Sequence, residues 1–420
     1  MLLEREECVT TVPHRRGTPG FRRITWALFA AGLATFTTLY CVQSLLPALT
    51  EQFRISPATS SLAVSLGTAG LAVGIIPLTA LSAVWGRTRM MTTSLFLAAS
   101  LGIAQAFSPG FPVLLALRGA QGLVLAGVVA TAMSYLAEEV ERGSLGFAMG
   151  LYVAGNSIGG MAGRLIGSLV LDVSNWRWAL AVVGALALGC AVLYRALILP
   201  SAHFRPVPPR LPALAGAVAR AVADRGLLRL FCCGLLLMGG FVTVYNYLGF
   251  RLLAVPFGLP HAVAGLISVV YLAGSISSAL AGRMADVLGR PRMLWATTLV
   301  MLAGVVLMLP SNLVSVTVGL VVTTAGFFAA HTTASSWVGA RAATLGVQGP
   351  ALYLCCYYLG SSIGGWLGGL AYGGAGWAGV TGYVGASVLT VLLLALSLRT
   401  LLPATSTTTP PSAMRAAGAS

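Results

Sequence analysis

Three ionisable side chains stand out because each lies well inside a long apolar stretch. Arg118 lies in the stretch 111–136, Arg164 in 146–171 and His331 in 312–338. A charged side chain at the centre of a membrane helix costs about 2.5 to 3.5 kcal/mol on insertion scales, so a retained one normally faces a cavity or a partner. Arg118 is the strongest candidate. For Arg164, which is nearer a stretch end, snorkelling or pairing with Asp172 stays open beside a functional role.

His331 is the only group deep in an apolar stretch that titrates near neutral pH, since none of the ten acids lies in the middle of one. It is either a proton carrier or a neutral hydrogen-bonding residue between helices. Further polar side chains would suit hydrogen bonding to a small polar solute, unless the tyrosines among them only pack. They are Gln43, Tyr40, Gln121, Tyr245, Asn246, Tyr247 and Thr332.

The charges in the apolar stretches indicate which charge class of solute these side chains would bind. Organic cations are commonly held by a buried carboxylate, whereas two arginines with hydroxyl and amide groups favour a neutral or anionic molecule. We therefore expect a sugar-like or organic-acid solute rather than a cationic drug. No P-loop, nucleophile with a base, or metal-ligand spacing occurs, so the sequence predicts neither an enzyme nor a cofactor or metal. A membrane protein that binds such a solute either moves it across the bilayer or, as the alternative of a different class, senses it without transport.

A short basic turn occurs twice. TALSAVWGRTR (79–89) and GRMADVLGRPR (282–292) align at an offset of 203, which pairs Gly86 with Gly289 and Arg87 with Arg290. Only the second copy has an acid, Asp286, where the first has Ala83. Such an acid can cap a helix or pair with Arg290 for about 0.3 to 1 kcal/mol. If its partner moves, this energy exists in one conformation only, so the turn is a candidate latch. The alternative is a set of cytoplasmic anchors.

The elements that carry these residues are membrane helices. The chain of 420 residues is 57% hydrophobic and only 8% charged, which excludes an ordinary soluble domain. Twelve apolar stretches are long enough to cross a bilayer, and in lipid they must be helices. They are 24–48, 59–83, 90–107, 111–136, 146–171, 176–199, 227–251, 260–282, 291–310, 312–338, 347–372 and 374–402.

All 25 basic residues are arginine, and their placement indicates the topology. With the N-terminus inside, cytoplasmic segments hold 20 of them, whereas the opposite face holds only Arg54, Arg177 and Arg251. The positive-inside rule then places both termini in the cytoplasm. The net charge of +15 is thereby a matter of topology, and no nucleic-acid partner is expected.

The chain repeats itself at one offset. FTTLY (36–40) matches FVTVY (241–245), and GNSIGG (155–160) matches GSSIGG (360–365), both at an offset of 205. We therefore predict two six-helix halves, 24–199 and 227–402, of the same orientation. A cytoplasmic linker, 200–226, joins them, with a helix from about 213 to 225 on the membrane surface. Cytoplasmic tails cover 1–23 and 403–420.

Three motifs carry a resemblance to a known family. GRMADVLGRPR resembles the major facilitator superfamily's signature between helices 8 and 9, and LALRGAQG (115–122) its fourth-helix signature. GNSIGG resembles the antiporter signature on helix 5, with Asn156 where a proline is usual. The chain is most similar to drug/proton-antiporter-type transport proteins of the bacterial inner membrane.

This resemblance implies an all-α major facilitator fold and a role for Arg118 in substrate or proton coupling. It also implies a latch at Gly86, Arg87, Asp286, Gly289 and Arg290, although the first copy departs from the pattern at Thr79 and Ala83. The helix-5 motif comprises Gly155, Asn156, Gly159, Gly160 and Arg164.

We therefore expect a monomeric secondary transporter in the bacterial inner membrane. It would export a small organic solute by alternating access, with protons moving the other way. The alternative is an uptake permease or uniporter for a neutral or anionic solute. The expected partners are the solute, protons and membrane lipid.

Overall fold

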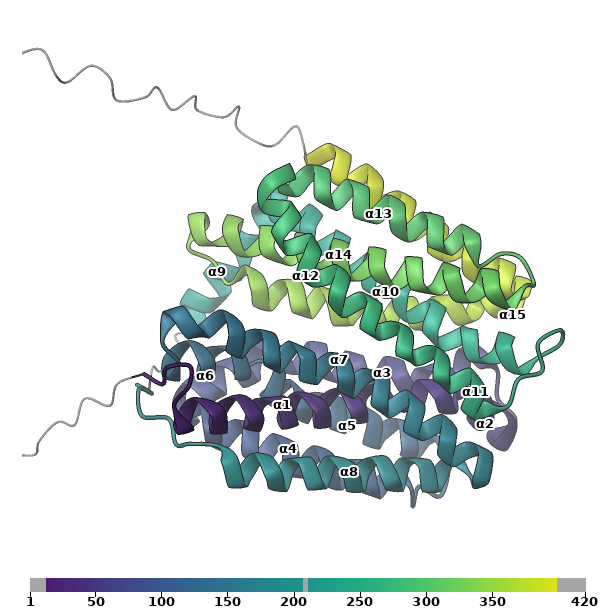
Figure 1. Cartoon of the computed structure of the whole chain (residues 1–420), viewed down its shortest axis with the longest axis horizontal. Helices are drawn as coiled ribbons and strands as arrows, with labels where there is room; N and C mark the ends of the chain where they lie inside the picture. Colours follow the sequence, from purple (N-terminus) through teal and green to yellow (C-terminus); the bar gives the residue numbers. More distant parts are fainter. Residues whose placement is uncertain (1–12, 207–210, 399–420) are drawn as a thin grey trace, which may run out of the picture.

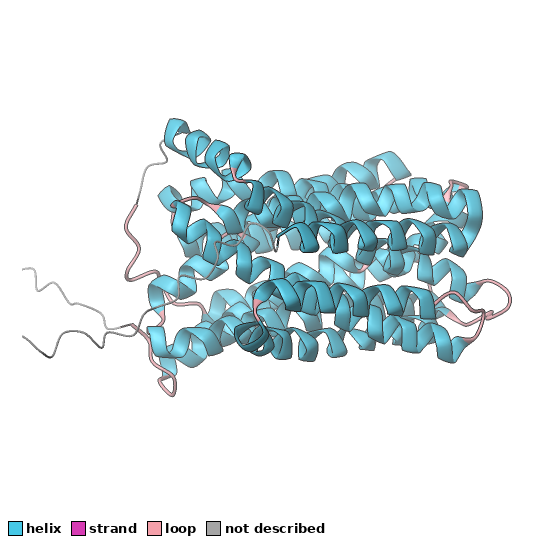
Figure 2. Cartoon of the chain, turned by 90° about the horizontal axis from the view of Figure 1, so that it is seen from above, coloured by secondary structure: helices cyan, strands magenta, loops and turns pink. Residues whose placement is uncertain are grey.

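Almost the whole described chain is helical. The computed structural model describes residues 13–206 and 211–398, so the predicted C-terminal tail and residues 1–12 of the N-terminal tail lie outside the described residues. Figures 1 and 2 show the helices running along the long axis of the molecule, with loops gathered at its two ends. The sequence's prediction of an all-helical protein is confirmed.

The helices form two bundles, one above the other in Figure 1. The N-terminal bundle contains α1 (Pro19–Tyr40), α2 (Val42–Phe53), α3 (Pro57–Trp85), α4 (Arg87–Gln105), α5 (Phe111–Val129), α6 (Ala132–Glu139), α7 (Arg142–Val173) and α8 (Trp176–Leu197). The C-terminal bundle contains α10 (Arg225–Leu253), α11 (His261–Leu266), the short 3-10 helix η1 (Ile267–Val270), α12 (Tyr271–Leu288), α13 (Arg290–Leu307), α14 (Leu313–Leu345) and α15 (Gly349–Leu398). Between the two bundles in the sequence comes α9 (Leu211–Ala223), in the segment where the linker was predicted to be helical.

Local sequence sets several helix ends. Thr18 and Ser56 cap α1 and α3 through their hydroxyls, and each is followed by a proline, which fits the first turn of a helix. Gly86 and Gly289 separate α3 from α4 and α12 from α13, with φ of 104° and 82°. Because L side chains rarely adopt such φ values, glycine is favoured at the tight turn of both basic segments.

Within the described residues, nine helical segments are long and apolar enough to cross a membrane. Two of the predicted spans fall outside this group: α4, which begins with two arginines, and α7, which carries two arginines and an aspartate. The third difference is α15, which is a single helical segment where the last two spans were predicted. Its 50 residues would extend about 75 Å if straight. Its backbone is interrupted at Ala375 and Gly376, where φ and ψ leave the helical region.

Glycines allow the central helices of each bundle to touch backbone to backbone. On α7, a Cβ at Gly155 or Gly159 would lie 2.5 Å from a backbone oxygen of α1. On α15, a Cβ at Gly360 or Gly364 would lie 2.0 or 2.5 Å from a backbone atom of α10. Thr37 of α1 donates to Gly159 O, and Thr243 of α10 donates to Gly364 O. The sequence repeat at offset 205 therefore corresponds to the same helix packing in both bundles.

The two ends of the molecule differ in how the bundles meet. We call the end with α6 and α9 in Figure 1 the arginine-rich end, and the end with α2 and α11 the far end. Five hydrogen bonds join the bundles among the described residues: Gln43–Asn246, Ser65–Ser362, Arg164–Tyr271, Asp172–Ala262 and Ala72–Cys355. Along α3 they reach from the far end only to Ala72, the middle of that helix. The bundles are thus joined in the far half of the molecule.

Candidate functional site

A cavity of about 560 Å³ lies between the two bundles. Helices α1 and α7 line it from one side, and α10, α12, α14 and α15 from the other. No arginine, lysine or acid is among the described residues that line it. Ten of its 24 lining residues are aromatic: Phe36, Tyr40, Tyr152, Phe241, Tyr271, Phe327, Phe328, Tyr353, Tyr357 and Tyr358. The cavity is therefore suited to a largely apolar organic molecule.

His331 is the titratable imidazole of this wall. Its Nδ1 lies 3.0 Å from the hydroxyl of Tyr353, and its ring lies 4.6 Å from the ring of Tyr357. The side chain is half-buried and lines the cavity directly. His331 thus lies in the cavity wall, and its role in proton coupling stays a prediction.

Arg164, 3% exposed, lies directly behind the far-end floor of the cavity, which Gly160 and Tyr271 line. Its Nε donates to Gln43 Oε1 at 2.6 Å, one terminal nitrogen donates to the carbonyl oxygen of Gly160, and the other donates to the hydroxyl of Tyr271 at 2.8 Å. Arg164 forms no ion pair with Asp172 in this conformation; that carboxylate accepts a hydrogen bond from the backbone N–H of Ala262. The arginine therefore joins α7 to both bundles.

Three tyrosine rings surround the same guanidinium. Its carbon lies 4.9, 5.1 and 4.5 Å from the ring centres of Tyr40, Tyr245 and Tyr271. Gln43, which accepts from Arg164, also donates to Asn246 of the other bundle at 2.7 Å. We call Gln43, Arg164 and these three tyrosines the arginine cage. Beyond it, towards the far end, lies a much smaller pocket of about 40 Å³ lined by Gln43, Arg164 and Tyr245. The cage thus separates the cavity from the far end.

Arg118, predicted to take part in substrate or proton coupling, lies away from the cavity. It is 1% exposed, and its guanidinium donates to the backbone oxygens of Ala63, Thr38 and Leu39 and to Gln121 Oε1. All these partners belong to the N-terminal bundle, and Arg118 is not among the residues that line the cavity. In this conformation it ties α1, α3 and α5 together. A direct role in substrate or proton coupling stays a prediction.

The remaining predicted polar residues divide into two groups. Tyr40 and Thr332 line the cavity. The others bond within the helix packing: Gln121 to Ala98 O, Tyr245 to Thr324, Asn246 to Gln43, and Tyr247 to Gly365 O. In the helix-5 motif, Asn156 and Gly160 line the cavity, whereas Gly155 and Gly159 face α1.

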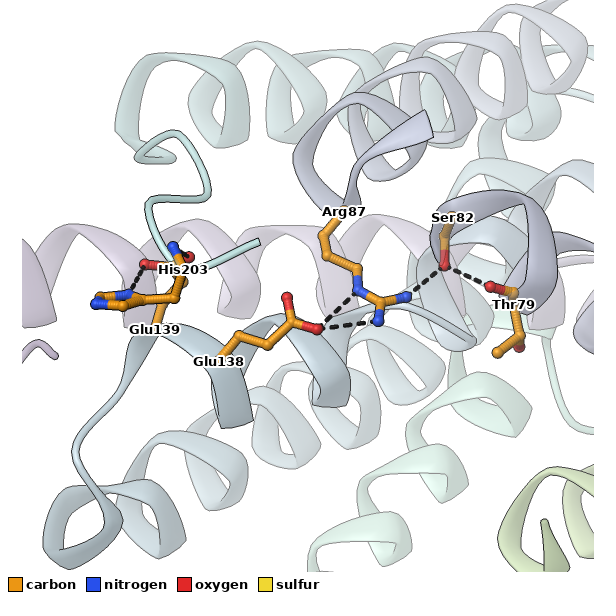
Figure 3. Close-up of polar contacts among 6 residues, drawn as sticks. All are labelled: Thr79, Ser82, Arg87, Glu138, Glu139 and His203. Atoms are coloured by element: carbon orange, nitrogen blue, oxygen red, sulfur yellow. Dashed lines mark hydrogen bonds and ion pairs between the residues drawn. The ribbon is translucent and has the colours of Figure 1, made fainter. Parts of the chain in front are cut away.

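The first basic turn has an ion pair that its own sequence lacks. Figure 3 shows Arg87, at the start of α4, reaching Glu138 at the end of α6 and Ser82 at the end of α3. Its two nitrogens lie 3.1 and 2.9 Å from Glu138 Oε1, and a third lies 2.8 Å from the Ser82 hydroxyl. Beside this pair, Glu139 accepts from the backbone and ring of His203. Glu138 thus supplies the acid where Ala83 cannot.

The second turn is arranged differently. Asp286 is exposed, and neither it nor Arg290 forms an ion pair with any described residue. The predicted Asp286–Arg290 pair is thus not made in this conformation. At the offset of 203, Glu138 corresponds to Arg341, so the C-terminal bundle has a basic residue at the acidic position. Arg341 instead holds Asp224, the cap of α10, through two hydrogen bonds of 2.6 and 2.9 Å. These bonds lower the pKa of the Asp224 carboxyl.

Several residues of the site were missed by the sequence analysis. Tyr271, which completes the arginine cage, and Tyr353 and Tyr357, which face His331, were not predicted. The spacing of Tyr353 and Tyr357, one helical turn apart, is the available signal, because it places both rings on one face. Glu138 was missed because no motif marks an acid at a helix end. Among residues 13–206 and 211–398 no three His, Cys, Asp or Glu side chains gather closely enough to hold a metal ion.

Comparison with known proteins identifies the family. The family model of the Major Facilitator Superfamily matches residues 28–349. The MFS-type transporter YybF of Bacillus subtilis is 42% identical over 380 residues, covering 90% of this chain and 94% of YybF. The inner membrane transport protein YnfM of Escherichia coli is 44% identical over 380 residues, covering 90% of this chain and 91% of YnfM.

Solved structures agree on the fold. A bacterial homologue of the human lysosomal transporter Spinster, in an inward-facing and occupied conformation, superposes with a TM-score of 0.73 at 15% identity, covering 91% of this chain and 97% of that one. The nucleoside transporter NupG gives 0.70 at 12% identity, covering 90% of this chain and all of that one. The resemblance drawn from the three motifs is confirmed: the chain belongs to the major facilitator superfamily, a family of non-enzymatic transport proteins, and is a multi-pass membrane transporter.

Proposed function

We propose that this chain is a secondary active transporter that exports a small organic solute by alternating access. The observation that carries the proposal is the cavity between the two bundles, closed at the far end by the arginine cage. In alternating access a central site opens to one side of the membrane at a time, largely by rocking of one bundle against the other. A cavity sealed on one side only is what one of these states requires.

The membrane topology completes the proposal. The sequence supports twelve spans, with α4 and α7 as spans and α15 divided at Ala375 and Gly376. The halves 24–199 and 227–402 then move as units about the linker 200–226, which carries α9. The positive-inside rule makes the arginine-rich end cytoplasmic, together with both termini. The conformation described is accordingly inward-facing. The protein is proposed to be a monomer in a bacterial inner membrane.

His331 is the proposed site of proton coupling. It lines the cavity, beside the hydroxyl of Tyr353, and no carboxylate is among the described residues that line it. In an antiporter, protonation and solute binding would then compete at one wall of the cavity. The same lack of an acid favours the second candidate function, a uniporter or uptake permease that needs no titrating group.

Everted membrane vesicles separate these functions. A pH gradient is formed, and sugars and organic acids are added singly. For an antiporter, a transported solute dissipates the gradient, and the His331→Phe variant, which retains a ring, moves the solute without dissipating it. For a uniporter, the solute enters while the gradient stays intact in both proteins. Failure of every solute to cross, with folded protein present, would contradict the proposed function.

The basic turns are proposed as conformational latches. In the inward-facing state the first turn is occupied by the Arg87–Glu138 pair, whereas Asp286 and Arg290 of the second turn have no ionic partner among the described residues. We infer that the second latch closes in the opposite state, when the arginine-rich ends approach one another. Arg118 is proposed to serve substrate or proton coupling through α1, α3 and α5, the helices that it ties together. Mutation of Arg118 tests this proposal.

A further inference from the structure

The solute class can be narrowed, given the transport function proposed above. We propose that the cavity binds aromatic carboxylates. The rings of the wall contact the aromatic part, and the hydroxyl of Tyr271 donates a hydrogen bond to the carboxylate. Size, charge and hydrogen bonding around the cavity each point to this class.

The wall selects for a flat apolar body. Rings come from both bundles, with Phe36 and Tyr152 on one side and Phe327 and Tyr357 on the other. Aromatic rings pair favourably with one another at centroid distances of about 4.5 to 7 Å. A solute ring between them would therefore contact both bundles at once, which is what a transported molecule must do.

The charge at the floor selects against cations. Arg164 has no acid within ion-pair distance among the described residues, so its charge is not neutralised there. Tyrosine rings can bind organic cations, but Tyr40 and Tyr271 already face the guanidinium of Arg164. A second cation against these rings would meet a like charge. An anion would meet the opposite one.

Tyr271 transmits this preference into the cavity. Its oxygen accepts a hydrogen bond from Arg164, and a phenol has one proton of its own to donate. The residue lines the cavity, so that proton is available to a solute oxygen. The arginine strengthens this donor because hydrogen bonds in a chain polarise one another. Arg164 is thus a positioning residue, and Tyr271 touches the solute.

Further hydrogen-bonding capacity lies at the same floor. The buried hydroxyl of Tyr40 makes no hydrogen bond of normal length and angle with described residues, although Ser361 lies beside it. Tyr40 lines the cavity, and its ring faces Arg164. Buried hydroxyls normally have partners, so this one is suited to the second oxygen of a carboxylate.

Three probes with one ring system test the inference: 2-naphthoate, 2-naphthamide and 2-naphthylmethylammonium. Binding to the purified full chain is measured by calorimetry. We expect naphthoate to bind about tenfold more tightly than the amide, the gain typical of a charge-assisted hydrogen bond, and the ammonium to bind more weakly than either. Tyr271→Phe, which keeps the ring, should reduce the ratio of naphthoate to amide affinity to near one.

Tyr353→Phe is the matched comparison. Tyr353 lines the same cavity, but its hydroxyl contacts His331 rather than Arg164. This variant should change all three affinities alike and leave the ratio intact. An ammonium bound as tightly as naphthoate, no binding of naphthoate, or a ratio unchanged in Tyr271→Phe would each overturn the inference.

Flux is scored separately in liposomes. If the ammonium is bound and transported, the charge class is wrong while the transport function stands. If naphthoate binds with the expected ratio but no probe crosses, the binding class stands and the transport function fails.

Discussion

Replacement of Arg164 by Gln should open the far end. The guanidinium crosses between the bundles through one hydrogen bond, to Tyr271, and through contacts with the rings of Tyr245 and Tyr271. A hydrogen bond to a charged group contributes about 1.5 to 3 kcal/mol, and each ring contact about 0.5 to 1 kcal/mol. The low sum, about 2.5 kcal/mol, allows for hydration of the arginine in the open state. It corresponds to roughly a 60-fold shift of the equilibrium towards a far end that is open.

A cysteine at position 168 reports that opening. Ser168 is 4% exposed and packs against Gly265 of the other bundle. In whole cells, a membrane-impermeant maleimide would label Ser168→Cys in proportion to the open fraction when opening is fast. Adding Arg164→Gln to the Ser168→Cys protein should raise its labelling rate several tens of times. The protein without the Ser168→Cys substitution gives the background from the native cysteines.

Arg177→Gln is the control at the same end. Arg177 donates to the backbone oxygens of Ala106 and Ser108, both in its own bundle, so its loss should leave the labelling rate near the parent value. A folded Arg164→Gln protein that labels no faster than the Arg177→Gln protein would refute the assignment of the arginine cage as the far-end closure.

Three further outcomes follow from the contacts described. Gly159→Ala should destabilise the purified protein by about 1 to 3 kcal/mol, because the new Cβ would lie 2.5 Å from Leu33 O, whereas Gly150→Ala, with nothing within 4 Å, should stabilise it by up to about 1 kcal/mol. Thermal unfolding in detergent checks both signs, and equal shifts would contradict the packing. Arg341 holds the pKa of Asp224 below its ordinary value of 3.8, so this carboxylate stabilises the fold above that pH and loses its contribution as pH falls through the lowered pKa. The difference in melting temperature between the parent and Asp224→Asn should accordingly shrink in acid, and a difference that grows there would exclude this linkage. Asp286→Asn should impair transport more than Ala83→Asp alters it, because Glu138 already pairs with Arg87; equal, negligible effects on flux would leave both turns as anchors.

Much of the fold was predictable from composition and repetition. Long apolar stretches predicted helices because lipid offers the backbone no hydrogen-bonding partners, and helices were found. The repeat at offset 205 anticipated two similar bundles, because glycines that let α7 approach α1 recur where α15 approaches α10. Span boundaries were less predictable: the turn between the last two predicted spans lies within α15, where only Ala375 and Gly376 leave helical geometry.

The site was predictable only in part. His331, which the sequence singled out as the only deep imidazole, lines the cavity, and its role in proton coupling stays a prediction. Neither arginine lines the cavity: Arg118 bonds to backbone oxygens of one bundle, whereas Arg164 bonds to Tyr271, which does line it. Depth in an apolar stretch cannot distinguish these cases, because both side chains are equally buried.

The amino-acid sequence by itself determined the class of protein, its helices and its internal repeat, because these depend on hydropathy along the chain and on short motifs. Only the tertiary structure decided which face of each helix meets the cavity. Helices that are apolar on all sides give little periodic signal for that choice. The hydrogen bonds of Arg164 to Gln43 and Tyr271, and the pairing of Arg87 with Glu138, join segments 51 to 121 residues apart. Such contacts depend on how the bundles pack, which no local pattern specifies.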